Sequence, residues 1–583
     1  MTGNKRRRRR RRKTKRLMLL IPAAVVILIL ALGIAILCKR FAPSKTVTDL
    51  AAYYNLTADL DTGRSGAASD EAAIVFDDTI LEERGLIREG QAYVRLSLLT
   101  DNVDERLYYD SNEKLMIISN AVRSIKVSPE QTYYTEDGDE VDSTSEDLGY
   151  TILTEYNDTV YVALEFACEF SDASYSVCED PKRIVITYKT GERTYCDALK
   201  NTQIRVRGGI KSEIVGTVSK GEKLLVLEDL EDWINVVSST GWVGYIKAGA
   251  VGDIYTETVT GDYDEPEYTS LNMGKTVKLG WAPVYVSSAN SYYSEYTEAA
   301  GDALNVYCPT WYSLADGQGG VTMRSDSTYV SAAHDDGYLV WALFDDADAE
   351  IAEAVLTHTS IREKVTESVI NDVLSKGIDG INIDFERINS SYGADYIQFI
   401  RELSIRCREE GIYLSVDNYA PYEYNACYHM EEQNRLCDYV MLMAYDDYLG
   451  TGEAGPSASL EFVRETVELS LEKVDASKLV VAMPFYSRLW TTDSNGELDR
   501  EEYSMVSAWQ RISAANVTAH WDETLGLWYA QYESDQGTVD AWLEDVDTIE
   551  AKMDLISTYN VAGYAFWRLG QEYSTIWDVI GRY

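Results

Sequence analysis

The 583-residue sequence has little of what metal sites and disulfide frameworks require, with four histidines and eight cysteines. The histidines are scattered, and the cysteine spacings match neither a zinc ribbon nor a dense disulfide framework. Cys168, Cys178 and Cys196 are near enough in sequence to include one pair, but the seven cysteines that follow Cys38 cannot all pair within the chain. We therefore predict no metal and no cofactor. The histidines are His334, His358, His429 and His520.

Basic residues are scarce outside the N-terminus. Lys and Arg number 53 against 96 Asp and Glu, which gives a formal net charge of −43. The first 40 residues contain 13 of those cations and no acidic residue, so the rest of the chain is more acidic still. Such a body would repel a phosphate backbone. The charge balance therefore argues against nucleic acid as a partner.

A long apolar run follows the basic N-terminus. Residues 1–16 end in KRRRRRRRKTKR, and residues 17–38 contain no charged residue. About 20 apolar residues span a bilayer as a helix, and positive charge stays on the cytoplasmic side. We predict a basic cytoplasmic tail, a transmembrane helix over 17–38 and an external body. The alternative is a cleaved secretory signal, which the length of the run and the lack of an A-x-A site disfavour.

An internal repeat lies beyond a predicted spacer, residues 39–72, which mixes Ser, Thr, Asp and Gly with few apolar positions. Residues 93–119 align with residues 161–187 at a constant offset of 68. Each copy predicts a short strand, a short helix and a strand pair, so we expect residues 73–192 to form one α+β domain. The pattern resembles the small repeat domain of copper amine oxidase N-termini and of many bacterial surface proteins, without copper ligands. We interpret it as a spacer or a wall contact.

Residues 198–253 contain short alternating segments separated by glycine-containing turns, including IVGTVSKGEKLLVLE and GWVGYI. This pattern predicts a small antiparallel barrel. The elements VRGG, KGE and GWVGY, in that order, resemble a bacterial SH3 domain, a family that often binds cell-wall peptide or glycan. The resemblance implies a wall ligand, while Trp233 and Trp242 are equally suited to fill the core.

Residues 272–583 alternate strand-like and helix-like segments, such as the amphipathic stretch 361–377. Eight strands in a repeating βα order predict a TIM barrel. The extra residues from Trp490 to about Thr548 predict a small α+β insertion between the last two strands. The expected strands are 277–285, 304–312, 338–344, 379–386, 412–420, 439–445, 479–486 and 562–569.

The segment DGINIDFE, residues 379–386, carries the clearest chemical signal. Successive side chains on a strand point to opposite faces, so its apolar residues share one face and Asn382, Asp384 and Glu386 share the other. Burying carboxylates without partners is costly, which favours a functional use for them. In a TIM barrel the active site lies at the carboxyl ends of the strands, which puts Glu386 at the rim.

Later strands bring further groups to the same mouth. Met443 and Tyr445 share a face of the strand that ends in MAYD, and Trp567 lies near the end of the last strand. An acid, a supporting carboxylate, a phenol and an indole around one mouth suit the cleavage of a sugar. The acid protonates the glycosidic oxygen, and the flat ring stacks on a pyranose.

These motifs make residues 272–583 similar to glycoside hydrolase family 18. DGINIDFE resembles the family signature DGxDxDxE, and MAYD, MPFY and Trp567 follow in the family's order. Beside an SH3-type domain, this resembles the spore-wall and cell-wall N-acetylglucosaminidase branch more than a secreted chitinase. The resemblance implies a retaining mechanism assisted by the substrate, with Glu386 as general acid and then base. It further implies that Asp384 orients the substrate's N-acetyl group, that Tyr445 hydrogen-bonds it and that Trp567 forms the floor.

One position departs from the family pattern. Asn382 stands where chitinases often have Asp, and an Asp there would repel Asp384 and could share its proton, whereas Asn can only hydrogen-bond. Asp379 and Asp446 are expected to be supporting residues rather than catalytic groups. Strand-end residues predicted to line the cleft, although such residues also serve as core, are Trp281, Met443, Tyr422, Trp311 and Trp490.

The sequence as a whole predicts a single-pass protein of the bacterial cell membrane with a cytoplasmic N-terminus and an external glycosidase. The substrate would be peptidoglycan or chitin oligomers, cleaved at β-1,4 bonds next to N-acetylglucosamine. Further predicted partners are the cell wall, through residues 198–253, and the membrane, through residues 17–38. The alternative is a catalytically inactive wall-binding protein whose barrel and SH3-type domain both hold glycan, because inward polar residues also occur in barrels without activity.

Overall fold

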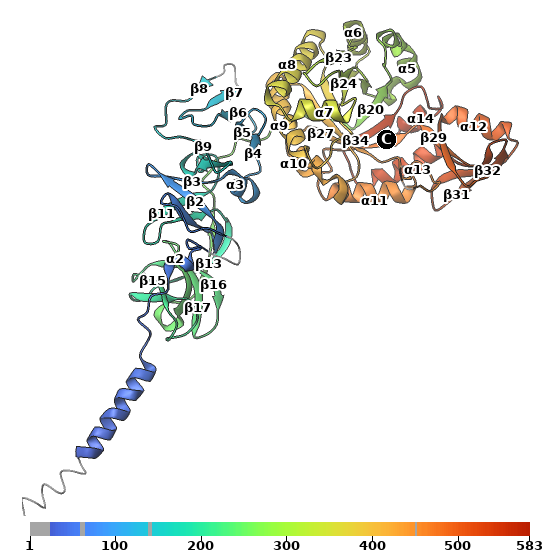
Figure 1. Cartoon of the computed structure of the whole chain (residues 1–583). Helices are drawn as coiled ribbons and strands as arrows, with labels where there is room; N and C mark the ends of the chain where they lie inside the picture. The colour runs from blue at the N-terminus through green and yellow to red at the C-terminus, as the bar shows by residue number, and fades with distance from the viewer. Residues whose placement is uncertain (1–23, 59–63, 138–142, 449, 451) are drawn as a thin grey trace, which may run out of the picture. The chain divides into compact units, whose positions relative to one another are not determined.

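A computed structural model describes residues 24–583 apart from 59–63, 138–142, 449 and 451. The chain divides into two compact units (Figure 1). One contains residues up to Asp104 together with Thr154–Asp264, and the other contains Glu105–Leu153 and Glu265–Tyr583. The predicted basic tail and the first seven residues of the predicted membrane span lie outside the described residues.

The helix Ala24–Phe41 is uncharged as far as Cys38, and none of its 18 residues is buried. Its length and composition are sufficient for it to cross a membrane. An isolated helix with no buried face gains nothing from packing within this chain.

The first unit contains a seven-stranded sheet of order β11-β12-β1-β2-β3-β10-β9. β3 and β10, the first strands of the two sequence repeats, pair antiparallel, with Val94 opposite Val162. These two valines are equivalent positions in the repeats, so the two copies meet about a local two-fold axis. The elements are β1 Glu71–Phe76, β2 Thr79–Arg88, β3 Gln91–Arg95, α3 Leu96–Asn102, β9 Leu153–Tyr156, β10 Thr159–Ala163, α4 Leu164–Ala167, β11 Ser174–Cys178 and β12 Arg183–Thr187.

A second sheet of the same unit has the order β15-β14-β18-β17-β16-β13-β19, and its pairings are antiparallel. It includes the residues predicted to be SH3-like. Trp242 is partly buried against the core, and the Arg183 guanidinium lies 3.8 Å from its ring centre. The elements are β13 Gly191–Asp197, β14 Thr202–Arg205, β15 Ile214–Val218, β16 Lys223–Asp229, β17 Trp233–Ser238, β18 Val243–Lys247, η1 Ala248–Ala250 and β19 Tyr255–Val259.

The predicted spacer, residues 39–72, is bound to this unit at several points. Val47 pairs with Ile214 at the edge of the second sheet, and the short helix α2, Leu50–Tyr53, follows. Tyr54 is fully buried, and its hydroxyl donates to the carbonyl of Gly241 at 2.7 Å. The expectation of a plain spacer needs correction, because burial of this aromatic side chain ties the segment to the fold.

The second unit contains the predicted barrel. Eight strands pair in parallel around a closed ring, β20-β21-β24-β25-β26-β27-β28-β34 and back to β20. This is the eight-stranded parallel arrangement of a TIM barrel. The strands are β20 Val277–Ala282, β21 Val306–Pro309, β24 Leu339–Asp345, β25 Gly380–Asp384, β26 Tyr413–Asn418, β27 Tyr439–Met443, β28 Leu479–Pro484 and β34 Gly563–Trp567.

Helices cover the outside of the ring (Figure 1). The predicted helix 361–377 is observed as α8, Thr359–Lys376, and it ends at Gly377, whose φ of 74° suits glycine. A short hairpin joins β24, formed by β22 Tyr312–Leu314 and β23 Val321–Met323. The other helices are η2 Ser287–Tyr292, α5 Tyr293–Ala300, η3 Gly301–Ala303, α6 Ser327–Asp335, α7 Ala349–Leu356, α9 Gly393–Glu410, η4 Glu423–Tyr428, α10 Met430–Leu436, α11 Leu460–Leu471, α13 Val546–Ser557 and α14 Ile576–Ile580.

The insertion between the last two barrel strands is an α+β subdomain, as predicted. It is a five-stranded sheet of order β30-β29-β33-β32-β31 with one helix, and it begins four residues before the predicted start. It has a small apolar core of its own around Leu489, Ile512 and Ala541. The elements are β29 Tyr486–Thr492, β30 Leu498–Ser504, α12 Met505–Ala514, β31 His520–Asp522, β32 Leu527–Ser534 and β33 Gly537–Leu543.

A further five-stranded sheet, β4-β5-β6-β7-β8, belongs to the barrel unit. The closing strand pair of the first repeat, β4 and β5, therefore belongs to the barrel unit, whereas that of the second repeat, β11 and β12, belongs to the first unit. The predicted 73–192 domain is thus divided between the two units. In the first copy Tyr108 and Asp110 face the barrel, whereas the equivalent positions of the second copy are Ser176 and Cys178. The strands are β4 Leu107–Asp110, β5 Leu115–Ser119, β6 Ser124–Val127, β7 Thr135–Asp137 and β8 Ser143–Thr144.

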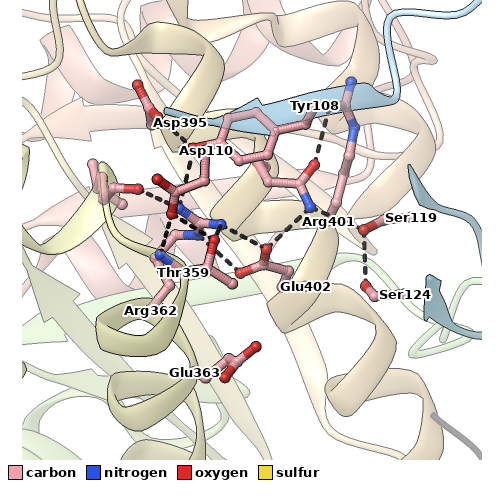
Figure 2. Close-up of polar contacts among 12 residues, drawn as sticks. Tyr108, Asp110, Ser119, Ser124, Thr359, Arg362, Glu363, Asp395, Arg401 and Glu402 are labelled. Carbon is pink, nitrogen blue, oxygen red and sulfur yellow. Dashed lines mark hydrogen bonds and ion pairs between the residues drawn. The ribbon is translucent and has the colours of Figure 1, made fainter. Parts of the chain in front are cut away.

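Polar side chains join this sheet to helices α8 and α9 (Figure 2). Asp110 accepts hydrogen bonds from the backbone N–H and the hydroxyl of Thr359, both at 2.7 Å, and so caps the start of α8. Arg362 is fully buried and donates to Glu402 at 2.9 and 3.0 Å and to the Tyr108 hydroxyl at 3.2 Å. The sheet therefore supplies partners that the barrel helices lack within themselves.

The cap also makes the joint, meaning the contact of the β4–β8 sheet with helices α8 and α9, sensitive to pH. Burial alone would raise the pKa of Asp110, but the hydrogen bonds from Thr359 and Glu113 outweigh it and hold that pKa below its ordinary value. Because the pKa is lower in the folded state, the stabilisation is present above the ordinary pKa of an aspartate and is lost as the pH falls through the lowered value.

We predict that Asp110→Ala weakens the joint by about 2 kcal/mol, because it leaves the buried N–H of Thr359 unpaired. Hydrogen exchange of the full chain, measured by mass spectrometry, should show faster exchange at the start of α8. Asp335→Ala, an exposed aspartate at the end of α6, is the matched control and should leave exchange there unchanged. Equal exchange in both variants would contradict the capping role.

Candidate active site

A cleft lies at the carboxyl ends of the barrel strands. The barrel strands and the residues that directly follow them supply most of its lining, and the insertion supplies the rest. Most of the predicted site residues meet here. Those that line the cleft are Trp281, Asp384, Glu386, Met443, Tyr445, Asp446 and Trp567.

Two carboxylates at the end of β25 differ sharply in their surroundings. Glu386 is exposed and accepts a hydrogen bond from the Tyr419 hydroxyl. Asp384 is half-buried, and its Oδ1 atom is buried without a hydrogen-bond partner among the described residues. Burial above all, followed by the charges of Glu386 and Asp417, raises the pKa of Asp384 well above its ordinary value. Glu386 therefore meets solvent, whereas the surroundings of Asp384 favour its protonated form.

Asn382 lies beneath them and is fully buried. Its Oδ1 accepts from Trp281 Nε1 at 2.8 Å, and its Nδ2 donates to Ser415 Oγ at 3.0 Å and to Asp417 Oδ1 at 2.7 Å. The amide thus has good partners at both ends. It fixes the floor of the cleft without adding a charge.

Asp446 holds the edge of the cleft next to the insertion. It has a φ of 71°, a left-handed conformation that non-glycine residues seldom adopt. Arg488, fully buried on β29, donates to Asp446 at 2.5 Å and to Glu502 at 2.8 Å, and the Tyr486 hydroxyl also donates to Asp446. These partners hold the strained backbone in place. Asp446 is therefore bound to the insertion, as a supporting residue would be.

Aromatic side chains form the apolar part of the cleft. Trp281 and Trp567 meet edge to face, with ring centres 5.8 Å apart and planes at 63°. Tyr445 is buried, and its ring is 6.2 Å from that of Tyr486. Flat apolar surface beside carboxylates suits a ring-shaped, hydroxyl-rich ligand, and the exposed acid suits proton transfer to it.

Four predicted residues lie elsewhere. Asp379, at the opposite end of β25, contacts His334 Nε2 at 2.8 Å and accepts from the backbone N–H of Val340 at 2.8 Å. Tyr422 lines a neighbouring, larger cleft, where its hydroxyl donates to Glu465 at 3.4 Å. Trp311 and Trp490 are buried. Their indole N–H groups donate to Asn290 Oδ1 at 2.8 Å and to the Gly455 carbonyl at 2.7 Å, so both serve as core.

Four residues that line the cleft escaped the sequence prediction: Asp417, Tyr419, Tyr486 and Glu502. The signal for the first two was present, because Ser415, Asp417 and Tyr419 alternate along IYLSVDNYA as the polar residues of DGINIDFE do. Tyr486 and Glu502 belong to the insertion, whose placement over the mouth is not encoded in a local pattern. In the part of the chain that the structure describes, no group of three His, Cys, Asp or Glu side chains is arranged to hold a metal ion.

Comparison with known proteins adds the family. The family model "Glycosyl hydrolases family 18" matches residues 333–572. The uncharacterized glycosylase YvbX of Bacillus subtilis is 25% identical over 248 residues, which cover 40% of this chain and 70% of that protein. The cortical fragment-lytic enzyme of the same organism is 23% identical over 242 residues, covering 39% of this chain and 55% of the enzyme, so this chain spans about half the length of that relative.

Among solved structures, the spore cortex-lytic enzyme SleL of Bacillus megaterium QM B1551 is similar at 18% identity, with a TM-score of 0.46. The match covers 56% of this chain and 77% of that one. The family match includes the strand with Asp384 and Glu386, the MAYD segment and Trp567. The chain therefore contains a glycoside hydrolase domain of family 18.

Proposed function

We propose that this protein is a membrane-anchored, extracytoplasmic glycosidase that hydrolyses β-1,4 bonds next to N-acetylglucosamine in peptidoglycan or a chitin-like glycan. The observation that carries the proposal is the pairing at the barrel mouth of an exposed Glu386 with a half-buried Asp384, beside the aromatic wall of Trp281 and Trp567. An acid that reaches solvent can protonate a glycosidic oxygen, and a flat indole can hold the sugar.

The proposed mechanism is retaining and uses the substrate's own acetamide as nucleophile. Glu386 donates a proton to the glycosidic oxygen while the acetamide oxygen attacks the anomeric carbon, which gives an oxazolinium intermediate. Asp384 orients the acetamide through its N–H, and the Tyr445 hydroxyl hydrogen-bonds the acetamide oxygen. Glu386, now a carboxylate, then takes a proton from the water that opens the intermediate. No enzyme nucleophile is needed, because the acetamide of the substrate supplies the attacking oxygen.

The choice of polymer follows from where the enzyme acts. An anchored enzyme meets the cell's own wall before any distant nutrient, which favours peptidoglycan. Curated relatives named as a glycosylase and as a cortical fragment-lytic enzyme support this choice. We further propose that residues 198–253 are an SH3-like wall-binding module and that the repeats within 73–192 serve as a spacer or wall contact.

We predict that Glu386→Gln lowers glycan hydrolysis at least 100-fold, because an amide cannot transfer the proton. Full-length protein in detergent would be incubated with purified peptidoglycan and with chitin oligomers, and the released ends identified by mass spectrometry. Glu465→Gln changes a glutamate outside this cleft, one that accepts a hydrogen bond from Tyr422, and as the matched control it should retain activity. Proton NMR should show the new reducing end forming first as the β-anomer.

The same assay separates the proposal from its alternative. If wild-type protein cuts neither polymer and still sediments with cell walls, the chain is a glycan-binding protein. Cleavage with inversion of the anomer would instead refute the substrate-assisted mechanism and leave a glycosidase of another type.

Tyr419→Phe should lower kcat/KM about 10-fold, because Glu386 loses the hydrogen bond that holds its carboxylate in place. Tyr422→Phe is the matched control: it removes a phenolic hydroxyl in the neighbouring cleft and should leave kcat/KM unchanged. Kinetics on a soluble N-acetylglucosamine oligomer would decide. An equal effect of both changes would show that Tyr419 does not position the acid.

The anchor generates a prediction of its own. In intact cells, added protease should digest the external body while an N-terminal tag stays protected, because the basic tail remains in the cytoplasm. Alkaline carbonate should leave the chain in the membrane pellet. Leu30→Arg, near the middle of helix Ala24–Phe41, should move a fraction of the protein from the pellet to the supernatant. A charge at that depth costs about 3 kcal/mol of insertion free energy. A shortened chain in the medium would show a cleaved signal instead of an anchor.

A further inference from the structure

Asp417 is a buried carboxylate for which the mechanism above has no use. It lies on β26, is 3% exposed and lines the same cleft as Asp384. β25 and β26 are parallel neighbours in which Asn382 pairs with Ser415 and Ile383 with Val416. The next step along both strands brings Asp384 level with Asp417, and alternation turns both side chains into the barrel.

The hydrogen bonds around Asn382 fix how Asp417 is held. The indole N–H of Trp281 can only donate, so the oxygen of the Asn382 amide must face Trp281 and its NH₂ group must face Asp417. Asp417 thus receives one firm hydrogen bond from a neutral group. Asn382 cannot accept or release a proton, so it does not neutralise its neighbour.

The surroundings of the pair are acidic or neutral. Among the described residues no Lys or Arg lines the cleft. The nearby cations are engaged elsewhere, Arg387 with Asp346 and Arg488 with Asp446 and Glu502. The titratable groups whose charges act on the pair come from five elements: Glu386 just after β25, Tyr419 just after β26, Tyr445 just after β27, Cys308 on β21, and Asp345 and Asp346 at the end of β24.

Two carboxylates in this position do not both ionise easily. Burial in the first place raises the pKa of each, and the charge of Glu386 raises both further. The hydrogen bond from Asn382 works in the opposite direction on Asp417 alone. With like charges on neighbouring strands and Asp417 buried, the favourable state of the pair holds one proton for two carboxyl groups.

We propose that Asp417 is a positioning residue that shares a single proton with Asp384. This inference rests on the proposed function, in which Asp384 orients the acetamide. Before substrate binds, the proton resides on Asp384. When the acetamide N–H approaches, the O–H bond on Asp384 breaks and an O–H bond forms on Asp417. Asp384 is then the carboxylate that accepts the N–H, and the enzyme neither gains nor loses a proton overall.

The shared proton compensates for the asparagine at position 382, where the family signature has an aspartate. A second carboxylate is present beside Asp384 after all, but it comes from the neighbouring strand rather than from the signature strand. The competing explanation is that Asp417 merely holds Asn382 in place. That role would require an acceptor at 417 but no titration.

The test uses full-length protein in detergent with four variants: Asp417→Asn, the exchange Asn382→Asp/Asp417→Asn, Ser415→Ala and, for the infrared readout, Asp384→Asn. The first removes the partner carboxyl, and the second restores one beside Asp384 from the other side. Ser415→Ala removes the other acceptor of the Asn382 amide without changing any charge, so it reports a purely structural disturbance. The readouts are the pH profile of kcat/KM on a soluble N-acetylglucosamine oligomer and the infrared C=O stretch of protonated carboxyl groups.

We expect Asp417→Asn to lower kcat/KM about 10-fold and to remove one ionisation from the pH profile. The exchange variant should recover most of the activity and the ionisation, while Ser415→Ala should lower activity without changing the profile. In the infrared spectrum at neutral pH, Asp384→Asn and Asp417→Asn should remove the same protonated band, and the exchange variant should restore it.

An unchanged pH profile in Asp417→Asn, or an exchange variant no better than Asp417→Asn, would overturn the shared proton. So would an infrared band that survives Asp417→Asn. The infrared readout needs no substrate. If wild-type protein cleaved no glycan, the proposed function would fail, and the spectrum would still decide whether the two carboxyl groups share a proton.

Discussion

The closure of eight parallel strands is the constraint on which the site depends. Parallel strands end on the same side of the barrel, and alternate residues point inward, so side chains far apart in sequence meet in one layer. Asp384 and Asp417 are neighbours only because β25 and β26 pair in the observed register. A shift of one residue would turn Asp417 to the outside of the barrel and bring Val416 or Asn418 inward in its place.

The same closure concentrates negative charge, and the fold offsets it in two ways. At the edge, the buried Arg488 binds Asp446 and Glu502, so the insertion neutralises the carboxylates nearest to it. In the centre the described residues supply no cation, and burial favours the protonated form instead. Stability is thus given up at the proposed catalytic site, where Oδ1 of Asp384 has no hydrogen-bond partner in the described part of the chain.

Much of this fold can be predicted from the sequence, and the parts that were not predicted have identifiable physical reasons. All eight predicted barrel strands are observed, because buried parallel strands are apolar runs between amphipathic helices. The division of the repeat region was not foreseen, since the two copies share the same apolar pattern. The difference lies in single polar residues, Tyr108 and Asp110, whose partners on α8 and α9 are some 250 residues away. For Asp417 the polar alternation of its own strand is visible in the sequence, but its proposed role depends on the pairing of β26 with β25.

The identity of residue 382 follows from a charge count at the barrel mouth. Asp384, Asp417 and Glu386 already face one another without a cation among the described lining residues. An aspartate at 382 would add a fourth carboxyl beneath them, in contact with Asp417 and fully buried. It would have to be protonated to remain there. Asparagine has nearly the same shape, accepts from Trp281 and donates to Asp417, and it needs no proton. The amide therefore suits a site whose second carboxylate comes from the next strand, and the two residues are best understood as a matched pair.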